Sequence, residues 1–169
     1  MNKQEKAQVI SELVDLINST DKIYLVDCST INGINTNLIR RSCFEKKVTM
    51  KVAKNTLIEK AIEQSNRKDV LKDLIPYLKG ETALMFAYEA PNAPAKIIKE
   101  FKEKCNGKPI LKAAFVEETL YVGDESVETL SQLKTKNELI ADVIGLLQSP
   151  IRRVISALEN KTKGEENAA

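Results

Sequence analysis

The stretch that decides the fold is residues 22–52, which read KIYLVDCSTINGINTNLIRRSCFEKKVTMKV. Its first seven residues are a short apolar run, which predicts a buried strand over 22–28, and a polar turn around Gly33 follows. Apolar residues at helical spacing then predict a helix over 35–46, and the alternation V-T-M-K-V predicts a half-exposed strand over 48–52. The stretch is therefore one strand–helix–strand unit.

The same signals extend this pattern in both directions along the chain. They predict further helices over 3–19, 54–65, 69–78 and 91–104, and further strands over 82–88, 110–117 and 120–122. Without the first helix and the pair at 54–78, the order is strand, helix, strand, strand, helix, strand. We therefore expect an α+β fold, a split β-α-β-β-α-β (ferredoxin-like) antiparallel sheet with a helical insert and with its helices on one face, followed by a long C-terminal α-helix.

The composition argues against catalysis and metal binding. Histidine is absent, and the three cysteines, Cys28, Cys43 and Cys105, are far apart and form no C-x-x-C pair. The commonest general base is therefore missing, and without histidine or a cysteine pair a zinc site is not expected. No glycine-rich phosphate loop or nucleophile–base pair is recognisable. Asp27, at the end of the first strand, has catalytic potential, but a turn-capping role is the stronger interpretation. We expect no catalytic residue, no metal and no cofactor.

Charge and hydropathy indicate the compartment and the kind of partner. No apolar run approaches the ~20 residues that span a bilayer, and the N-terminus does not resemble a signal peptide. We expect a protein of the reducing cytoplasm with no membrane partner. Residues 1–109 hold 19 basic against 14 acidic residues, and residues 110–169 hold 7 against 10. The basic excess predicts a polyanionic partner, with a solvated charged face as the alternative.

The C-terminal region predicts one amphipathic helix from Lys136 onward, with two equivalent docking segments. The motif V-I-x-x-L occurs at Val143 and again eleven residues later at Val154, and Pro150 between the copies is expected to kink the helix. The alternative is that the helix folds back on its own sheet. The apolar stripe consists of Leu139, Ile140, Val143, Ile144, Leu147, Ile151, Val154, Ile155 and Leu158.

The densest candidate phosphate site is the stretch KVAKNTL over residues 51–57, where a strand passes into a helix. We expect Asn55 or Thr56 to cap that helix, and its free N–H groups with Lys54 to cradle a phosphate. Arg40, one helix earlier, can add a bidentate contact. The alternative is that Asn-Thr serves only as a helix cap.

These residues also resemble a known family. The stretch at 51–57 is similar to the K-V-x-K-N-T-L signature of the ribosomal stalk-base family, the bacterial large-subunit protein L-ten with its archaeal and eukaryotic relative P-zero. Further resemblances follow in order along residues 3–160, at Ile39-Arg40, L-x-G-x-T-A over 78–83, Lys112-Ala113-Ala114 with Leu120, Glu138-Leu139-Ile140-Ala141 and Pro150.

The resemblance implies a structural role in the large ribosomal subunit and no enzyme activity. Residues 1–133 would bind large-subunit ribosomal RNA beside the protein L-eleven. Residues 134–169 would carry two dimers of the acidic stalk protein L-seven/L-twelve, which recruit translational GTPases, one on each V-I-x-x-L segment. The implied RNA-binding residues are Arg40, Arg41, Lys46, Lys47, Lys51, Lys54, Asn55, Thr56 and Lys3, and the stalk-binding residues are those of the apolar stripe.

The chain departs from the family pattern at three places. Many members have Arg-Gly where Ser29-Thr30 stand, a Gly where Lys47 stands, and a Pro where Glu81 stands. These differences put an RNA contact near residue 29 in doubt, and none of them touches the C-terminal stripe. The alternative function is a ribosome-assembly factor of the same superfamily that binds the same RNA site. Such factors lack the stalk-binding helix, so the repeated segments argue against it.

Overall fold

Strand β1 (Lys22–Asp27) lies at the centre of a five-stranded sheet whose order is β2-β3-β1-β4-β5. The computed structural model describes the backbone of residues 3–105 and 107–166, and the side chains of residues 4–105 and 107–157. The other strands are β2 (Val48–Val52), β3 (Ala83–Ala87), β4 (Ile110–Val116) and β5 (Thr119–Val122).

The chain divides into two units, Met1–Leu133 and Lys134–Ala169. The first contains the sheet, and the second consists mainly of α7 (Lys136–Glu166). Among the described residues, no helix combines the length and the apolar character needed to cross a membrane. The helices of the first unit are α1 (Lys3–Ser19), α2 (Gly33–Glu45), α3 (Asn55–Gln64), α4 (Lys68–Leu71), the 3-10 helix η1 (Lys72–Tyr77), α5 (Ala93–Lys104) and α6 (Ser126–Gln132).

All four strand pairs are antiparallel, as the split β-α-β-β-α-β arrangement requires. Ala83 at the start of β3 lies opposite both Val26 of β1 and Val52 of β2, and Asp27 lies opposite Ile110 of β4. The ends of β1 and β2 therefore meet the starts of β3 and β4 at one end of the sheet. The predicted fold class is confirmed, with β5 added at the β4 edge.

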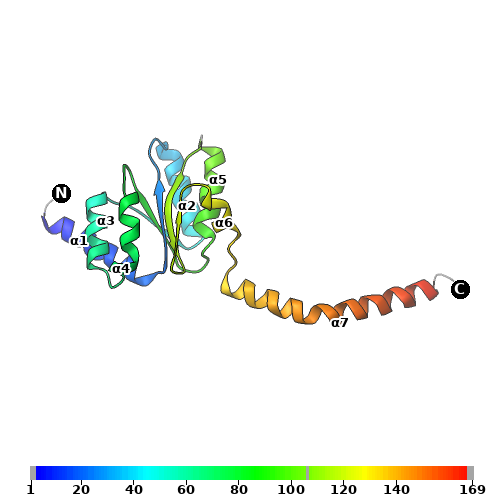
Figure 1. The fold of residues 1–169 in the computed structure, drawn as a ribbon. Coiled ribbons are helices and arrows are strands. Elements are labelled where there is room, and N and C mark those ends of the chain that lie inside the picture. The colour runs from blue at the N-terminus through cyan, green and yellow to red at the C-terminus, as the bar shows by residue number, and fades with distance from the viewer. Residues whose placement is uncertain (1–2, 106, 167–169) are drawn as a thin grey trace. The chain divides into compact units, whose positions relative to one another are not determined.

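Helices cover both faces of the sheet, so the expectation of helices on one face is wrong. Figure 1 shows α1, α3 and α4 on one side of the sheet and α2, α5 and α6 on the other. Successive residues of β1 enter opposite cores: Tyr24 and Val26 pack with α2, α5 and α6, whereas Ile23 and Leu25 pack with α1 and α3. The helical insert is needed because β1 and β3 are apolar on both faces.

Two local differences from the sequence prediction have physical reasons. Helix α6 was not predicted, because its seven residues give too few turns for a periodic pattern, yet it buries Val127 and Leu130. The single helix predicted over 69–78 is α4 followed by η1, with Pro76 inside the 3-10 segment. Proline lacks the N–H that an α-helix needs at that point.

Two of the departures from the family pattern lie where the backbone is left-handed. Thr30 has φ +64° and Lys47 has φ +54°, and these are positions at which the sequence resemblance implies glycine. The left-handed region costs an L-residue about 1–2 kcal/mol, which glycine avoids. Lys47 ends the turn that joins α2 to β2, and its N–H donates to the Phe44 carbonyl over 3.1 Å.

We therefore predict that Lys47→Gly stabilises the chain by about 0.5–1 kcal/mol. The relief of backbone strain at this position outweighs the larger conformational entropy that glycine gives the unfolded state. Chemical denaturation measures the change. Lys46→Gly is the matched control, because Lys46 has φ −94° and therefore no left-handed strain to relieve. This substitution also removes one exposed ion pair. It is expected to be neutral or destabilising. Equal destabilisation by both substitutions would contradict the argument.

Candidate functional site

Eight of the nine predicted RNA-binding residues lie on or beside β2, an edge strand of the sheet. They form two groups. Lys51, Lys54, Asn55 and Thr56 lie at the end of β2 and the start of α3, on the α3 side. Arg40, Arg41, Lys46 and Lys47 lie on α2 and in the turn before β2, in the opposite layer. The side chains of the ninth residue, Lys3, and of Leu158 on α7 lie outside the described residues.

The start of α3 is open, but it is not capped as predicted. Lys54 occupies the N-cap position, and no side-chain cap hydrogen bond is present there. The expectation that Asn55 or Thr56 caps the helix is therefore wrong. Both lie one or two residues inside α3, and the first turn is closed by the Leu57 N–H, which donates to the Lys54 carbonyl over 2.8 Å. Uncapped first-turn N–H groups remain as donors for an anion.

Asn55 instead fixes the position of this helix start. Its side-chain amide donates to the carbonyl oxygens of Leu78 (3.0 Å) and Gly80 (2.8 Å). The Leu78–Gly80 turn leads into β3, so the two bonds tie the first turn of α3 to the end of the sheet. Gly80 has φ +69°, which glycine adopts without strain. Asn55 is thus a positioning residue.

The structure adds two lysines that sequence reasoning missed. Lys6 of α1 and Lys60 of α3 line one hollow together with Lys54, Thr56 and Leu57. Three lysines therefore line one hollow beside the first turns of α3, where the helix dipole is also positive. No local signal identifies Lys6, because it reaches the site only through the packing of α1 against α3.

Several of the predicted basic residues already have carboxylate partners. Lys46 lies 3.5 Å from Glu100, Lys51 lies 3.4 Å from Glu12, and Lys47 is paired with Glu89. All three pairs are exposed and therefore weak, so an RNA phosphate can replace them at little cost. For Lys54, Arg40 and Arg41, the described part of the chain offers no ion-pair partner within 4.0 Å.

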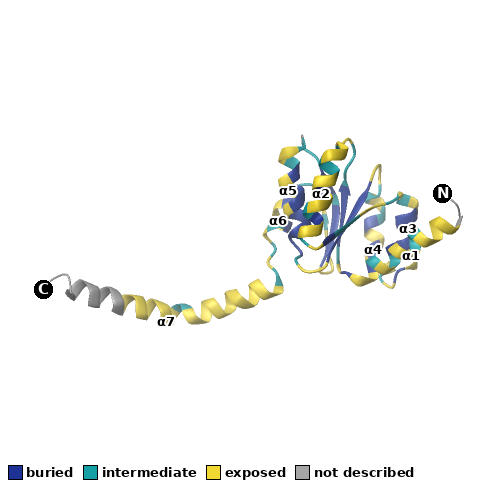
Figure 2. Cartoon of the chain, turned by 180° about the vertical axis from the view of Figure 1, so that it is seen from behind, coloured by how far each residue is buried: buried dark blue, intermediate teal, exposed yellow. Residues whose placement is uncertain are grey.

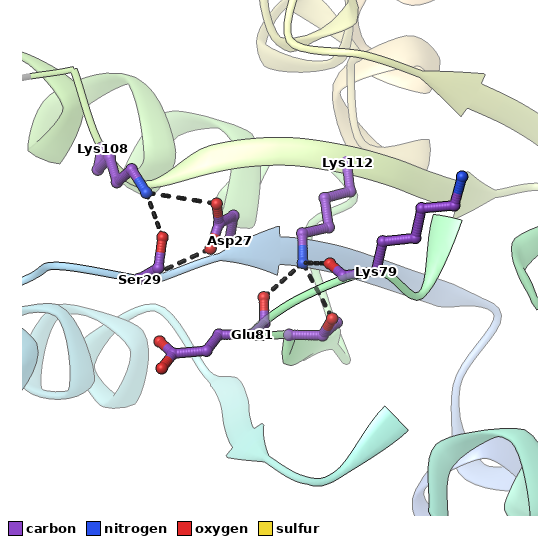
Figure 3. A network of polar contacts seen from close by, with 7 residues as sticks. Asp27, Ser29, Lys79, Glu81, Lys108 and Lys112 are labelled. Carbon is purple, nitrogen blue, oxygen red and sulfur yellow. Dashed lines mark hydrogen bonds and ion pairs between the residues drawn. The ribbon is translucent and has the colours of Figure 1, made fainter. Parts of the chain in front are cut away.

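Asp27 and Ser29 form a network with Lys108 at the same end of the sheet (Figure 3). The Ser29 N–H donates to Asp27 Oδ1 over 3.0 Å, which closes a turn after β1. Lys108 Nζ lies 3.4 Å from Asp27 Oδ2 and donates to Ser29 Oγ. Burial opposes ionisation of Asp27, but the bonds from Ser29 and Lys108 outweigh it and lower its pKa. The turn-capping interpretation of Asp27 is confirmed.

Lys112 joins β4 to the turn before β3 (Figure 3). Its ammonium donates to the carbonyl oxygen of Lys79 over 2.6 Å, to that of Glu81, and to Thr82 Oγ1 over 3.0 Å. Burial lowers the pKa of this group. Together with Asn55, Lys112 holds the Leu78–Thr82 turn from two sides. Some lysines at this end of the sheet, such as Lys54, are candidates for phosphate binding. Others, such as Lys108 and Lys112, stabilise turns next to the strands.

Two of the three cysteines, Cys28 and Cys43, lie where burial disfavours a reactive thiolate. Burial raises the pKa of Cys28 and of Cys43 to about 11, so both are thiols at neutral pH. Within the described ranges, no group of three or more Cys, Asp or Glu side chains is placed to hold a metal ion.

Helix α7 begins with a capping box formed by Thr135 and Glu138. The Thr135 N–H donates to Glu138 Oε2 over 2.7 Å, and the Glu138 N–H donates to Thr135 Oγ1 over 3.3 Å. Lys134, just before the helix, is paired with Asp142. The helix continues through Pro150 and bends near its middle, as Figure 1 shows. Contacts among nearby residues of the same unit therefore stabilise the N-terminus of α7.

Every described apolar residue of the predicted stripe on α7 is exposed, as the yellow helix in Figure 2 shows. The exposed fractions run from 49% for Ile144 to 74% for Leu147. Leu146, at 73%, is equally exposed and was missed because it lies outside the repeated motif. Nine large apolar side chains of one helix are thus open to solvent, which is typical of a helix that binds a partner.

Comparisons with known proteins agree with the sequence resemblance. Residues 1–103 match the family model described as "Ribosomal protein L10". The "Large ribosomal subunit protein uL10" of Christiangramia forsetii is 46% identical over 95% of this chain and 90% of its own length. The proteins of the same name from Flavobacterium psychrophilum and Salinibacter ruber are 42% and 34% identical, over 98% and 94% of this chain and 98% and 87% of their own lengths.

We predict that Asp27→Asn destabilises the chain at pH 7 by about 1 kcal/mol, because it removes the ion pair with Lys108. The folded-state pKa of Asp27 is lowered, so its contribution is complete above the unfolded pKa of about 3.9 and is lost as the pH falls through the folded value. Denaturant titrations of both proteins at pH 7 and pH 3 measure the difference. If the two proteins differ equally in free energy of unfolding at pH 3 and at pH 7, the stabilising role of the ionised Asp27 is contradicted.

Proposed function

The chain belongs to the ribosomal protein L10 family, and from this premise we propose that it forms the base of the ribosomal stalk. As a member of that family it is a component of the large ribosomal subunit, located with ribosomes in the cytoplasm, and not an enzyme. The proposal is that residues 1–133 bind large-subunit ribosomal RNA beside the protein L-eleven, and that α7 carries acidic stalk-protein dimers.

The stalk role is supported above all by the exposed stripe of α7. Nine described apolar side chains, each at least 49% exposed, lie on a helix that its own unit does not cover. Such a surface binds partner helices in the helix-in-groove mode. The two V-I-x-x-L segments on either side of Pro150 give two docking sites and hence two dimers of L-seven/L-twelve. These dimers would bring GTP-bound translation factors to the ribosome.

The RNA-binding role is supported by the charge along β2. The open start of α3 offers N–H donors and three lysines on one side of the strand, and Arg40 and Arg41 are exposed on the other. Contacts of this kind are made mainly to phosphates and are therefore weakened by salt. Lys54 is the central residue, since it lies at the N-cap position and lines the basic hollow.

A ribosome-assembly factor of the same superfamily remains the second candidate, because it would use the same RNA surface. The exposed stripe of α7 favours the stalk role, since an assembly factor without stalk partners has no use for it. Copurification with acidic dimers from the native host distinguishes the two.

We predict that Lys54→Ala and Arg40→Ala each weaken binding to large-subunit ribosomal RNA and lower the slope of log K against log salt by about one unit, because each removes one phosphate contact. Filter binding at several salt concentrations measures both quantities. Lys72→Ala, on η1 and already paired with Asp69, is the control and should leave them unchanged. If both variants bind the RNA with wild-type affinity and wild-type salt slope, the assignment of this site is wrong.

We also predict that Ile144→Asp and Ile155→Asp each remove one stalk dimer, because a carboxylate in an apolar groove is strongly unfavourable. The two residues are equivalent in the repeat and equally exposed, at 49%. Native mass spectrometry of the reconstituted complex counts the dimers. Ser156→Asp, on the polar side of α7, is the control and should keep two. Loss of both dimers from one substitution would contradict independent segments.

A further inference from the structure

Phe44 is the most exposed large apolar residue of the described chain, at 85%. The chain has four phenylalanines and no tryptophan. The other three, Phe86, Phe101 and Phe115, are at most 5% exposed and belong to the two cores. Phe44 is therefore the one exposed phenylalanine of the described chain, and it belongs to neither core.

The surroundings of Phe44 are basic. On a helix, residues three and four positions apart are neighbours, with Cβ atoms about 5–6 Å apart. Arg41 and Arg40 stand at those positions before Phe44, and both are exposed on α2. The turn that follows carries Lys46 and Lys47, which are paired with Glu100 and Glu89. Two guanidinium groups without ion-pair partners among the described residues thus flank one ring.

The faces of the ring are also open. Among the described residues, Lys104 lies 5.2 Å from the centroid of the Phe101 ring, and no cation covers Phe44. The other exposed apolar residues of α2, Ile34 and Leu38, lie ten and six positions away, about 15 Å and 9 Å along the helix. On α2 the ring is therefore not part of a continuous apolar stripe. Protein interfaces typically have an apolar centre depleted of charge, which this surface lacks.

We propose that Phe44 stacks on an unpaired base of the ribosomal RNA, while Arg40 and Arg41 bind the adjacent phosphates. This inference rests on the proposed function, and it adds base stacking to a surface that otherwise binds only phosphates. Aromatic rings flanked by basic side chains are the usual platform for unpaired bases. Phe44 lies in the last turn of α2, before β2 begins, and Lys54 lies beyond the end of β2, so the RNA would follow about 17 Å of this edge strand.

The absence of tryptophan allows a direct test on the full chain. Phe44→Trp introduces the sole tryptophan, and in vitro transcribed large-subunit ribosomal RNA is the probe. We expect its emission to be quenched on binding, with affinity within about threefold of wild type, since a larger ring also stacks. Val70→Trp, at an exposed position on α4 in the opposite layer, is the matched control and should not be quenched. Unquenched emission from RNA-bound Phe44→Trp would overturn the proposal.

Affinities of three further variants separate stacking from other contacts. Phe44→Ala and Phe44→Leu should both bind about tenfold more weakly with an unchanged salt slope, because the ring and not a charge is lost. Phe44→Tyr should bind like wild type. Wild-type affinity in Phe44→Leu would indicate an apolar contact and overturn the proposal, as would a blue shift in the emission of Phe44→Trp that requires the L-eleven protein.

The outcomes also distinguish this inference from the function on which it rests. If wild type binds the RNA with a steep salt slope and Phe44→Ala binds equally well, stacking is wrong and the phosphate-binding surface stands. If wild type itself does not bind the RNA, both fail. Circular dichroism of Phe44→Ala should match wild type, because an 85% exposed side chain contributes little to the core.

Discussion

Alternate residues of β1 enter two different hydrophobic cores, and the rest of the first unit is organised around this constraint. Tyr24 and Val26 are fully buried on one face, and Leu25 is fully buried on the other. A central strand of this kind cannot face water, so both faces must carry helices. The Tyr24 hydroxyl is satisfied within the core, where it donates to the Pro91 carbonyl over 2.5 Å. The functional surface is thereby left to the edge strands, the sheet ends and the outer sides of the helices.

The basic surface follows from that arrangement. Strand β2 is an edge strand, so Lys51 and Val52 are exposed, and the chain passes from it directly into the open start of α3. The same packing that buries Ile58 and Ile62 of α3 turns Lys60 outward beside Lys54. Asn55 and Lys112 then hold the neighbouring turn in place. These bonds therefore fix the backbone around the start of α3, which would reduce the entropy lost in the proposed RNA binding.

Much of this was predictable from sequence because the determining signals are local. Apolar runs and helical periods identified every strand and all helices but α6, and the motif at residues 51–57 located the strand-to-helix junction. What failed depended on tertiary contacts. Lys6 reaches the site only through helix packing, and Asn55 bonds to a turn more than twenty residues away rather than to its own helix. The exposure of Phe44 was also inaccessible, because a phenylalanine in an amphipathic helix normally faces the core.

The binding modes proposed for the two units rest on different physical interactions. The proposed phosphate binding by the first unit would be driven by counterion release and would weaken as salt rises, whereas the proposed burial of the α7 stripe would be driven by the hydrophobic effect, which ionic screening does not weaken. The capping box of Thr135 and Glu138 starts α7 from contacts inside its own unit. The first turn of α7 is therefore stabilised by residues of its own unit. We therefore expect rising salt to weaken the proposed RNA binding more than the proposed binding of stalk dimers, because only the former depends on phosphate contacts.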